Sequence, residues 1–335
     1  MTRRFLAFLD TAAGRAARYT FSALLVAALV GSVNWSQFAD LRGQFTYMPV
    51  TLAALVAGVT FPLHAWRWWL LLRAQGVTLT LRWAHVVTWI GNFYNAFLLG
   101  GLGGDAAKAF YVCRDAPSRA PAGLAATVLD RVLGLIVLLS IAGLTLLLKL
   151  DAVSRHAELR FLLGLCAALS LASLVVFLVA CRRTPHWLAR WLGETRTATI
   201  ADILQRTASA RGALIAALAL SYLIWWLDFV SVWLLARSIG FPLPFIEVSL
   251  AMSVAYAATV LPVSVGGHGI REGAMLGTFA LLGLLPNDDA RQHALLLAVL
   301  IWAIGVLWSL VGGLVLLFYR LRPTPTEPAV PPPTR

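Results

Sequence analysis

Long apolar runs constrain this chain more than any other feature of its sequence. Hydrophobic residues make up 60% of the 335 positions and charged residues only 13%, whereas a soluble domain carries about a quarter charged residues. A helix needs roughly 20 apolar residues to cross the hydrocarbon core of a bilayer. We therefore expect an all-α integral membrane protein, a polytopic helical bundle with full spans at 21–40, 49–72, 128–149, 160–181, 212–236 and 293–319.

Two further apolar regions, 84–111 and 245–284, are interrupted by glycines. The first contains GGLGGDAAK at 100–108, and the second contains LPVSVGGHGIREG at 261–273. Backbone groups that a broken helix frees cannot face lipid, so such breaks persist only against protein or a water-filled cavity. We expect each region to form a re-entrant hairpin that enters and leaves the membrane on one side.

The distribution of basic residues supports this layout. With a cytoplasmic N-terminus and two re-entrant hairpins, the cytoplasmic stretches carry 19 Lys and Arg residues and the opposite stretches carry six. This bias follows the positive-inside rule. The net charge of +12 is therefore interpreted as a determinant of topology, not as a nucleic-acid footprint. The prediction is a bacterial inner membrane protein with both termini in the cytoplasm.

The two halves of the chain are similar to each other. WLLLRAQGVTLTL at 69–81 aligns with WLLARSIGFPLPF at 233–245 at an offset of 164, and a one-residue slip places GGLGGDAAK over VSVGGHGIR. Each half then reads span, span, hairpin, span, which predicts an inverted repeat, an architecture typical of secondary transporters. The alternative is that two leucine-rich helices match by composition. The expected divisions are a cytoplasmic segment 1–20, membrane repeats 21–155 and 156–320, and a disordered proline-rich cytoplasmic tail 321–335.

The second glycine motif contains candidate binding residues. Gly266 and Gly267 permit a tight turn, and a helix that resumes after them presents its N-terminus as an anion site. Arg271 suits a phosphate or carboxylate, His268 can donate a hydrogen bond or shuttle a proton, and Glu272 could cap the helix or hold Arg271. The alternative is a buried Arg271–Glu272 ion pair that only fixes the hairpin.

The first motif contains a comparable set. Gly103 and Gly104 would form the turn, and Asp105 and Lys108 would share a helix face, either in a simple salt bridge or in a site.

Further candidates lie in the spans. Asp130 and Arg131 would begin the third full span, where an acid suits the helix dipole and an arginine can snorkel, unless the cytoplasmic hairpin folds over them. His64 and Asp228 are separated by the repeat offset. An aspartate facing lipid is costly, so Asp228 is expected in a cavity or a helix contact.

Several function classes lack their motifs in the full sequence. No Gly-x4-Gly-Lys-Ser/Thr loop, HExxH, GxSxG or Cys/His metal spacing occurs, so no ATP-driven pump, cofactor or metal is expected. Catalysis stays open, because a membrane transferase needs only a carboxylate and an arginine.

Three segments carry a family resemblance. NFYNAFLLGGLGGDAAKAFYV, AATVLDRVLGL and LPVSVGGHGIREG resemble signature segments of the lysylphosphatidylglycerol synthetase transmembrane-region family, also called flippase-like domain proteins. The resemblance covers about 20–320. Its best-known members fuse this region to a soluble aminoacyl-transferase and move the aminoacylated lipid across the bilayer. This chain departs in having Leu99 and Lys108 where the family has proline and arginine, and no soluble aminoacyl-transferase domain is expected after residue 320. The resemblance thus implies the transport half only.

The expected function is a flippase-like lipid transporter that moves an anionic or zwitterionic headgroup without ATP hydrolysis. One alternative is an accessory subunit or membrane-embedded enzyme of lipid or glycolipid biosynthesis, for example of isoprenoid or hopanoid-like lipids, and another is a secondary carrier of a small anion. The expected partners are a membrane lipid with a phosphate-bearing or aminoacylated headgroup and a separate lipid-modifying enzyme, with no nucleic acid.

Overall fold

The computed structural model describes residues 46–95, 103–182, 194–259 and 269–318, which are helical with short connections and contain no strand. The predicted span 21–40 and the predicted tail 321–335 lie outside these ranges. The elements in chain order are α4 (Tyr47–Ala74), α5 (Leu81–Asn95), α6 (Gly103–Asp115), the short helix η1 (Pro117–Arg119), α7 (Ala120–Leu148), α8 (Leu150–Arg155), α9 (Ala157–Arg182), α11 (Glu194–Ser209), α12 (Arg211–Ser238), α13 (Phe245–Ala258), α14 (Ile270–Leu281) and α15 (Asp288–Phe318).

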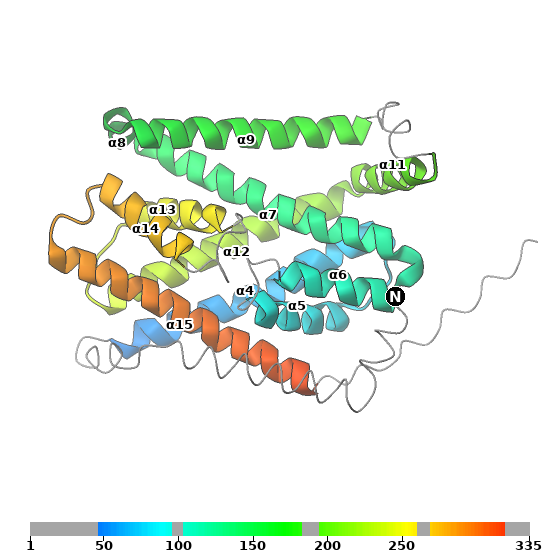
Figure 1. Ribbon diagram of the computed structural model, residues 1–335, viewed down its shortest axis with the longest axis horizontal. Coiled ribbons are helices and arrows are strands. Elements are labelled where there is room, and N and C mark those ends of the chain that lie inside the picture. Colours follow the sequence, from blue (N-terminus) through cyan, green and yellow to red (C-terminus); the bar gives the residue numbers. More distant parts are fainter. Residues whose placement is uncertain (1–45, 96–102, 183–193, 260–268, 319–335) are drawn as a thin grey trace, which may run out of the picture.

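Four of the predicted spans are confirmed as helices long and apolar enough to cross a membrane, namely α4, η1 with α7, α12 and α15. They correspond to the apolar runs 49–72, 128–149, 212–236 and 293–319. Helix α9 covers the predicted span 160–181, although the side chains of its last residues are not described. The long helices run roughly along the longest axis of the molecule (Figure 1). Composition alone therefore located the scaffold of the fold.

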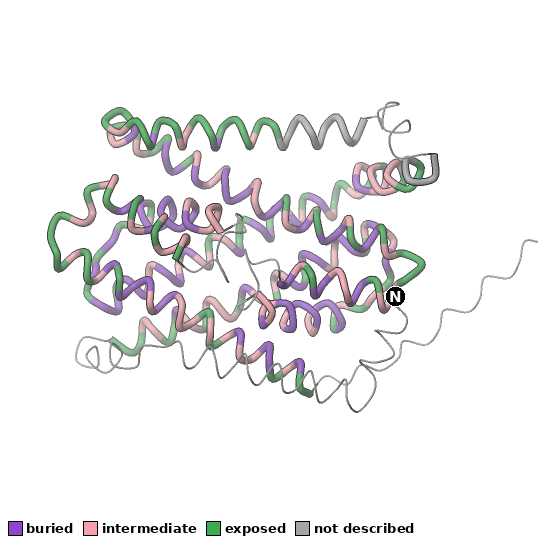
Figure 2. The backbone as a smooth tube through the Cα atoms, viewed as in Figure 1, coloured by how far each residue is buried: buried purple, intermediate pink, exposed green. Residues whose placement is uncertain are grey.

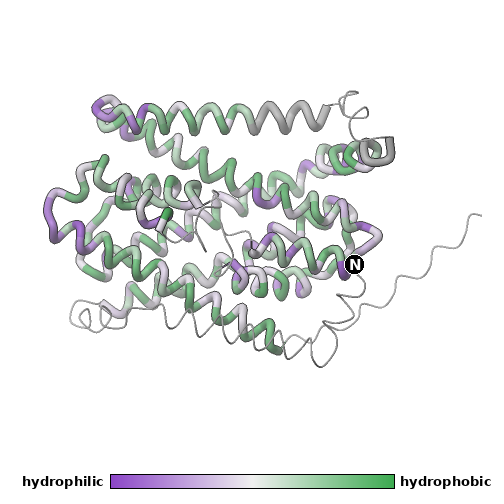
Figure 3. Tube along the Cα trace, in the orientation of Figure 1, coloured by the Kyte–Doolittle hydropathy of each residue, from purple (hydrophilic) through white to green (hydrophobic). Residues whose placement is uncertain are grey.

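Helices α4 and α12 pack against each other along the molecule and form its centre, with α7 beside both. They are antiparallel, because the Thr46 N–H at the start of α4 donates to the Ser238 carbonyl at the end of α12 at 3.0 Å. Buried residues concentrate on the inner faces of α7, α12 and α13 (Figure 2). Hydrophilic residues gather at the two ends of the long axis (Figure 3), as expected for a bundle that crosses a bilayer.

Each interrupted region contains two helices that pack against each other, α5 with α6 and α13 with α14, and we refer to each pair as a hairpin. At the base of the first hairpin, the Trp83 indole on α5 donates to Asp115 at the end of α6 at 2.7 Å. At its tip, the Gly104 N–H donates to the Asn95 side-chain oxygen at 2.5 Å, which satisfies one of the free donors of the α6 N-terminus. Helices α13 and α14 pack against each other in the same manner. The turns themselves, 96–102 and 260–268, lie outside the described residues.

The offset of 164 holds in the local geometry as well as in the sequence. Helices α4 and α12 have 28 residues each and start 164 positions apart. Each is followed by a glycine with positive φ, Gly76 at 75° and Gly240 at 72°, a conformation that other residues rarely adopt. Trp69 donates to the Leu79 carbonyl at 3.0 Å, and Trp233 donates to the Leu243 carbonyl at 3.1 Å. The two segments are therefore similar in local structure as well as in sequence.

The close approach of α5 and α6 generates a stability prediction. A methyl group added at Gly103 would meet the backbone carbonyl of Tyr94 on α5, and overpacking of this kind costs about 1–3 kcal/mol. Gly103→Ala should therefore lower the midpoint of thermal unfolding in detergent, followed by tryptophan fluorescence. Gly212→Ala is the matched control, because a methyl group there meets nothing within 4 Å. An equal loss in both variants would contradict the tight hairpin.

Candidate functional site

A buried cluster of charges joins three helices. Asp130 on α7 accepts a hydrogen bond from Arg67 Nε on α4 at 2.7 Å and another from Lys108 Nζ on α6 at 3.0 Å. Asp130, Arg67 and Lys108 are only 4%, 4% and 8% exposed. Arg67 Nη1 also donates to the Ser221 hydroxyl on α12 at 2.9 Å. One carboxylate therefore fastens the first hairpin to the central helices.

The cluster carries two cations and one anion. The Lys108 ammonium also lies 4.8 Å from the centre of the Trp68 ring, an arrangement that stabilises a cation by about 0.5–2 kcal/mol. Charges in an apolar interior persist only when they are paired and hydrogen-bonded. Lys108 is thus held by the Asp130 carboxylate, which it shares with Arg67, and by the face of the Trp68 ring.

The charged residues of the first motif have other partners than the sequence predicted. Asp105 and Lys108 do not form a salt bridge with each other, because each has a partner on α7. Arg131 donates to Asp105, and Lys108 donates to Asp130. The prediction that Asp130 lies in the first turn of its span was also wrong, since the helix already begins at Ala120. The first hairpin packs over α7, so Asp130 and Arg131 are tertiary contacts and not residues at a free helix start.

Arg67 was missed as a candidate site residue. It lies inside the apolar run 49–72, and a charged residue in such a run is a functional candidate by default. That signal was present in the sequence. Its partners Asp130 and Ser221 are 63 and 154 positions away, and spacing along one helix could not have identified them.

The second motif resumes as α14. Gly269 precedes the helix with φ +84°, and its N–H donates to Glu272 Oε2 at 2.6 Å. The other oxygen, Oε1, accepts from Arg271 Nη2 at 2.6 Å and from Arg271 Nε at 3.2 Å. Glu272 thus both caps the helix and holds the guanidinium. Gly266, Gly267 and His268 lie outside the described residues, and their roles stay predictions.

A partly open cavity of about 240 Å³ lies where the two hairpins meet the central helices. The central turns of α4 and α15 contribute to its wall, as does the second half of α12. Asn92, near the tip of the first hairpin, lines it together with Tyr256 and Arg271, near the tip of the second. The polar lining residues are Thr60, His64, Asn92, Asp228, Ser231, Tyr256 and Arg271.

The repeat contributes matched pairs to this cavity. His64 on α4 and Asp228 on α12 are 164 positions apart, and both line it. Asn92 on α5 and Tyr256 on α13 are related by the same offset. The structure thus brings together three of the predicted residues, His64, Asp228 and Arg271. Glu272 lies on α14, where it holds Arg271. The other predicted residues that the structure describes lie in the cluster around α7 or in the first hairpin.

Two cavity groups have unused hydrogen-bonding capacity. Within the part of the chain that the structure describes, Asn92 Nδ2 has no hydrogen-bond partner, and the Asp228 carboxylate takes part in no hydrogen bond or salt bridge. Buried polar groups without partners are rare in folded proteins. Together with a guanidinium, these groups make the cavity a polar chamber that can bind a small charged group.

These features define a helical, multi-pass membrane protein with a polar cavity. Residues 15–290 match the family model described as the lysylphosphatidylglycerol synthase TM region. This match covers most of the chain, which therefore belongs to that family, and it confirms the resemblance of the glycine motifs. No curated protein matches the chain.

The charge cluster can be tested by removing its shared carboxylate. Asp130→Ala leaves Arg67 and Lys108 buried without their partner, and breaking a buried pair costs about 3–5 kcal/mol. We expect a large fall in the thermal unfolding midpoint, partly reversed when Lys108→Met is added, because one stranded charge is then removed.

Asp202→Ala is the matched control for this test. Asp202 forms an exposed pair with Arg206 on α11, and such pairs contribute little. Equal stability of the two single variants would contradict a structural role for the buried cluster.

Proposed function

We propose that this protein moves a lipid with an anionic or zwitterionic headgroup across the bacterial inner membrane without ATP hydrolysis. The observation that carries the proposal is a cavity that residues of both hairpins line and in which Arg271 lies beside the central helices. Sites of this kind, at the interface of two repeats and near the middle of the bilayer, are typical of secondary transporters.

The proposed layout has six full spans and two re-entrant hairpins in an inverted repeat. Contacts in the structure support it, because they join stretches that the charge distribution assigns to one side. The Gln75 amide donates to the Ile203 carbonyl at 3.3 Å, and both belong to proposed cytoplasmic stretches. Lys149 donates to Glu247, on the proposed opposite side. In this layout the segments 1–20 and 321–335 are cytoplasmic.

The size of the cavity favours a headgroup over a whole lipid. Pockets for drug-sized ligands measure about 300–1,000 Å³, and this cavity measures about 240 Å³. The headgroup would occupy the cavity while its hydrophobic chains stay in the surrounding lipid. A guanidinium can bind a phosphate through two parallel hydrogen bonds, and Glu272 already fixes the orientation of Arg271.

The two glycine motifs would then have different tasks. Lys108 corresponds to Arg271 in the alignment of the motifs, but it is buried against Asp130 and does not line the cavity, whereas Arg271 does. We assign Lys108, Asp130 and Arg67 to holding the first hairpin in place, and Arg271 to contacting the headgroup. Since the sequence has no nucleotide-binding loop, movement is downhill or coupled to an ion gradient.

The proposal is tested by reconstituting the protein in proteoliposomes with a fluorescent phosphatidylglycerol and adding an impermeant reductant. Wild-type protein should expose inner-leaflet probe to the reductant. Arg271→Ala should slow this by about tenfold or more, as expected for losing a charged hydrogen bond of roughly 1.5–3 kcal/mol.

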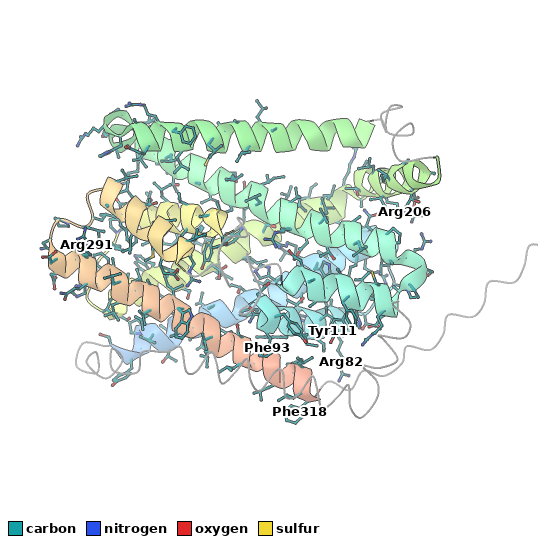
Figure 4. The ribbon with its side chains drawn as sticks, in the orientation of Figure 1. Arg82, Phe93, Tyr111, Arg206, Arg291 and Phe318 are labelled. Carbon is teal, nitrogen blue, oxygen red and sulfur yellow. The ribbon has the colours of Figure 1, made fainter. Side chains whose placement is uncertain are left out.

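Arg291→Ala is the matched control, because Arg291 is exposed and lies near the start of α15, at one end of the long axis (Figure 4). Both variants are first checked for wild-type elution and unfolding temperature. Wild-type transfer by folded Arg271→Ala protein would remove Arg271 from the site, and no transfer by the wild type would reject the proposed function.

A further inference from the structure

The Asp228 carboxyl is a feature of the cavity that headgroup contact does not explain. It lies on α12 within the sequence SYLIWWLDFVSVWLL and lines the cavity. In the described ranges it has no hydrogen bond and no ion pair. The Asp228 side chain is half-buried, and a carboxylate that is partly removed from water without a partner is disfavoured. An acid inside a membrane helix is a functional candidate.

The groups that surround Asp228 come from several helices. His64 on α4, Tyr256 on α13 and Arg271 on α14 are the titratable or charged residues in the cavity lining besides Asp228 itself, and Asn92 on α5 adds an amide. Helix α15 contributes Ile301, Ile304, Gly305 and Trp308, none of which titrates. Tyr256 lies within electrostatic reach of Asp228, Arg271 and Glu272.

The cations near the cavity are already committed to other anions. Glu272 accepts two hydrogen bonds from the Arg271 guanidinium. The cationic neighbours of His64, Arg67 and Lys108, both pair with Asp130. Asp228 therefore has no dedicated counterion among the described residues. Its negative charge can be removed only by a proton or compensated by a group that enters the cavity.

Resting on the proposed function, we propose that Asp228 carries a proton and that one proton moves with each anionic headgroup. The carboxylate takes a proton from water on one side of the membrane and becomes a neutral carboxylic acid. An anionic phosphate then enters beside Arg271 without repulsion from Asp228. After the headgroup leaves on the other side, the acid gives its proton to water there, and the carboxylate is restored.

This coupling follows from reciprocity between the two binding events. If protonation of Asp228 favours entry of an anion, then an anion in the cavity must favour protonation by the same factor. A pH gradient would then drive lipid movement. With one proton per headgroup, each pH unit can shift the ratio of lipid between the leaflets by up to about tenfold.

The test measures transfer of the fluorescent phosphatidylglycerol from the outer to the inner leaflet of proteoliposomes, with and without an acidic exterior. The measured quantity is the ratio of the two rates, so that a change in absolute rate does not affect the result. Lipid transfer by the wild type should be faster with the gradient than without it. Asp228→Asn, which cannot titrate, should show no acceleration, whereas Asp228→Glu should retain it.

Asp151→Asn is the matched control, because it makes the same substitution at an exposed carboxyl on α8, and it should keep the wild-type ratio. If folded Asp228→Asn protein shows the same ratio of transfer rates as the wild type, the proposal is overturned. If the wild type transfers lipid at the same rate with and without the gradient, the coupling is overturned and the transport function stands. Complete absence of wild-type transfer would instead reject the proposed function.

Discussion

The fold depends on how buried charge is compensated in an interior that is otherwise apolar. Asp130 accepts hydrogen bonds from Arg67 on one helix and Lys108 on another, so a single carboxylate fixes three elements relative to one another. Outside an aqueous environment each of these charges would be costly alone. Their mutual dependence therefore selects one arrangement of α4, α6 and α7. The first hairpin could not be displaced from α7 without exposing charge to an apolar surrounding.

That arrangement in turn explains why a cavity can persist in the middle of the bundle. Both hairpins break their helices near the central spans, and freed backbone groups need protein or water as partners. Asn95 and Glu272 each supply an acceptor for a backbone N–H beside such a break. Asn92, Tyr256 and Arg271, close to the same breaks, line the cavity. Hydrogen-bonding side chains are thus concentrated in one cavity, where protein contacts could replace the hydration shell of a headgroup.

The sequence predicted the parts of the fold that depend on local or periodic signals. Apolar runs located α4, α7, α12 and α15 because length and composition suffice to recognise a span. The glycine motifs lie where α5 is followed by α6 and where α13 is followed by α14, and glycine is the residue that best tolerates unusual backbone geometry. Identities at 69–81 and 233–245 predicted that His64 and Asp228 are equivalent, and the structure places them in one cavity.

Contacts between distant residues could not be predicted in this way. The three-residue spacing of Asp105 and Lys108 suggested a local pair, but partners on α7 outcompete it in the folded chain. The start of α7 was placed at 128 because the strongly apolar run begins there, whereas small residues extend the helix back to Ala120. Arg67 could be identified as unusual from its surroundings, but its pairing with Asp130 depends on how helices pack.

The account rests on the claim that the central cavity holds a phosphate-bearing lipid headgroup through Arg271. The most direct measurement is the lipid retained by the protein when it is extracted in native nanodiscs and analysed by mass spectrometry, with Arg271→Ala in parallel. The account predicts that one class of phosphate-bearing lipid is enriched over the bulk membrane with the wild type and lost with the variant. Bulk lipid composition with both proteins would contradict it.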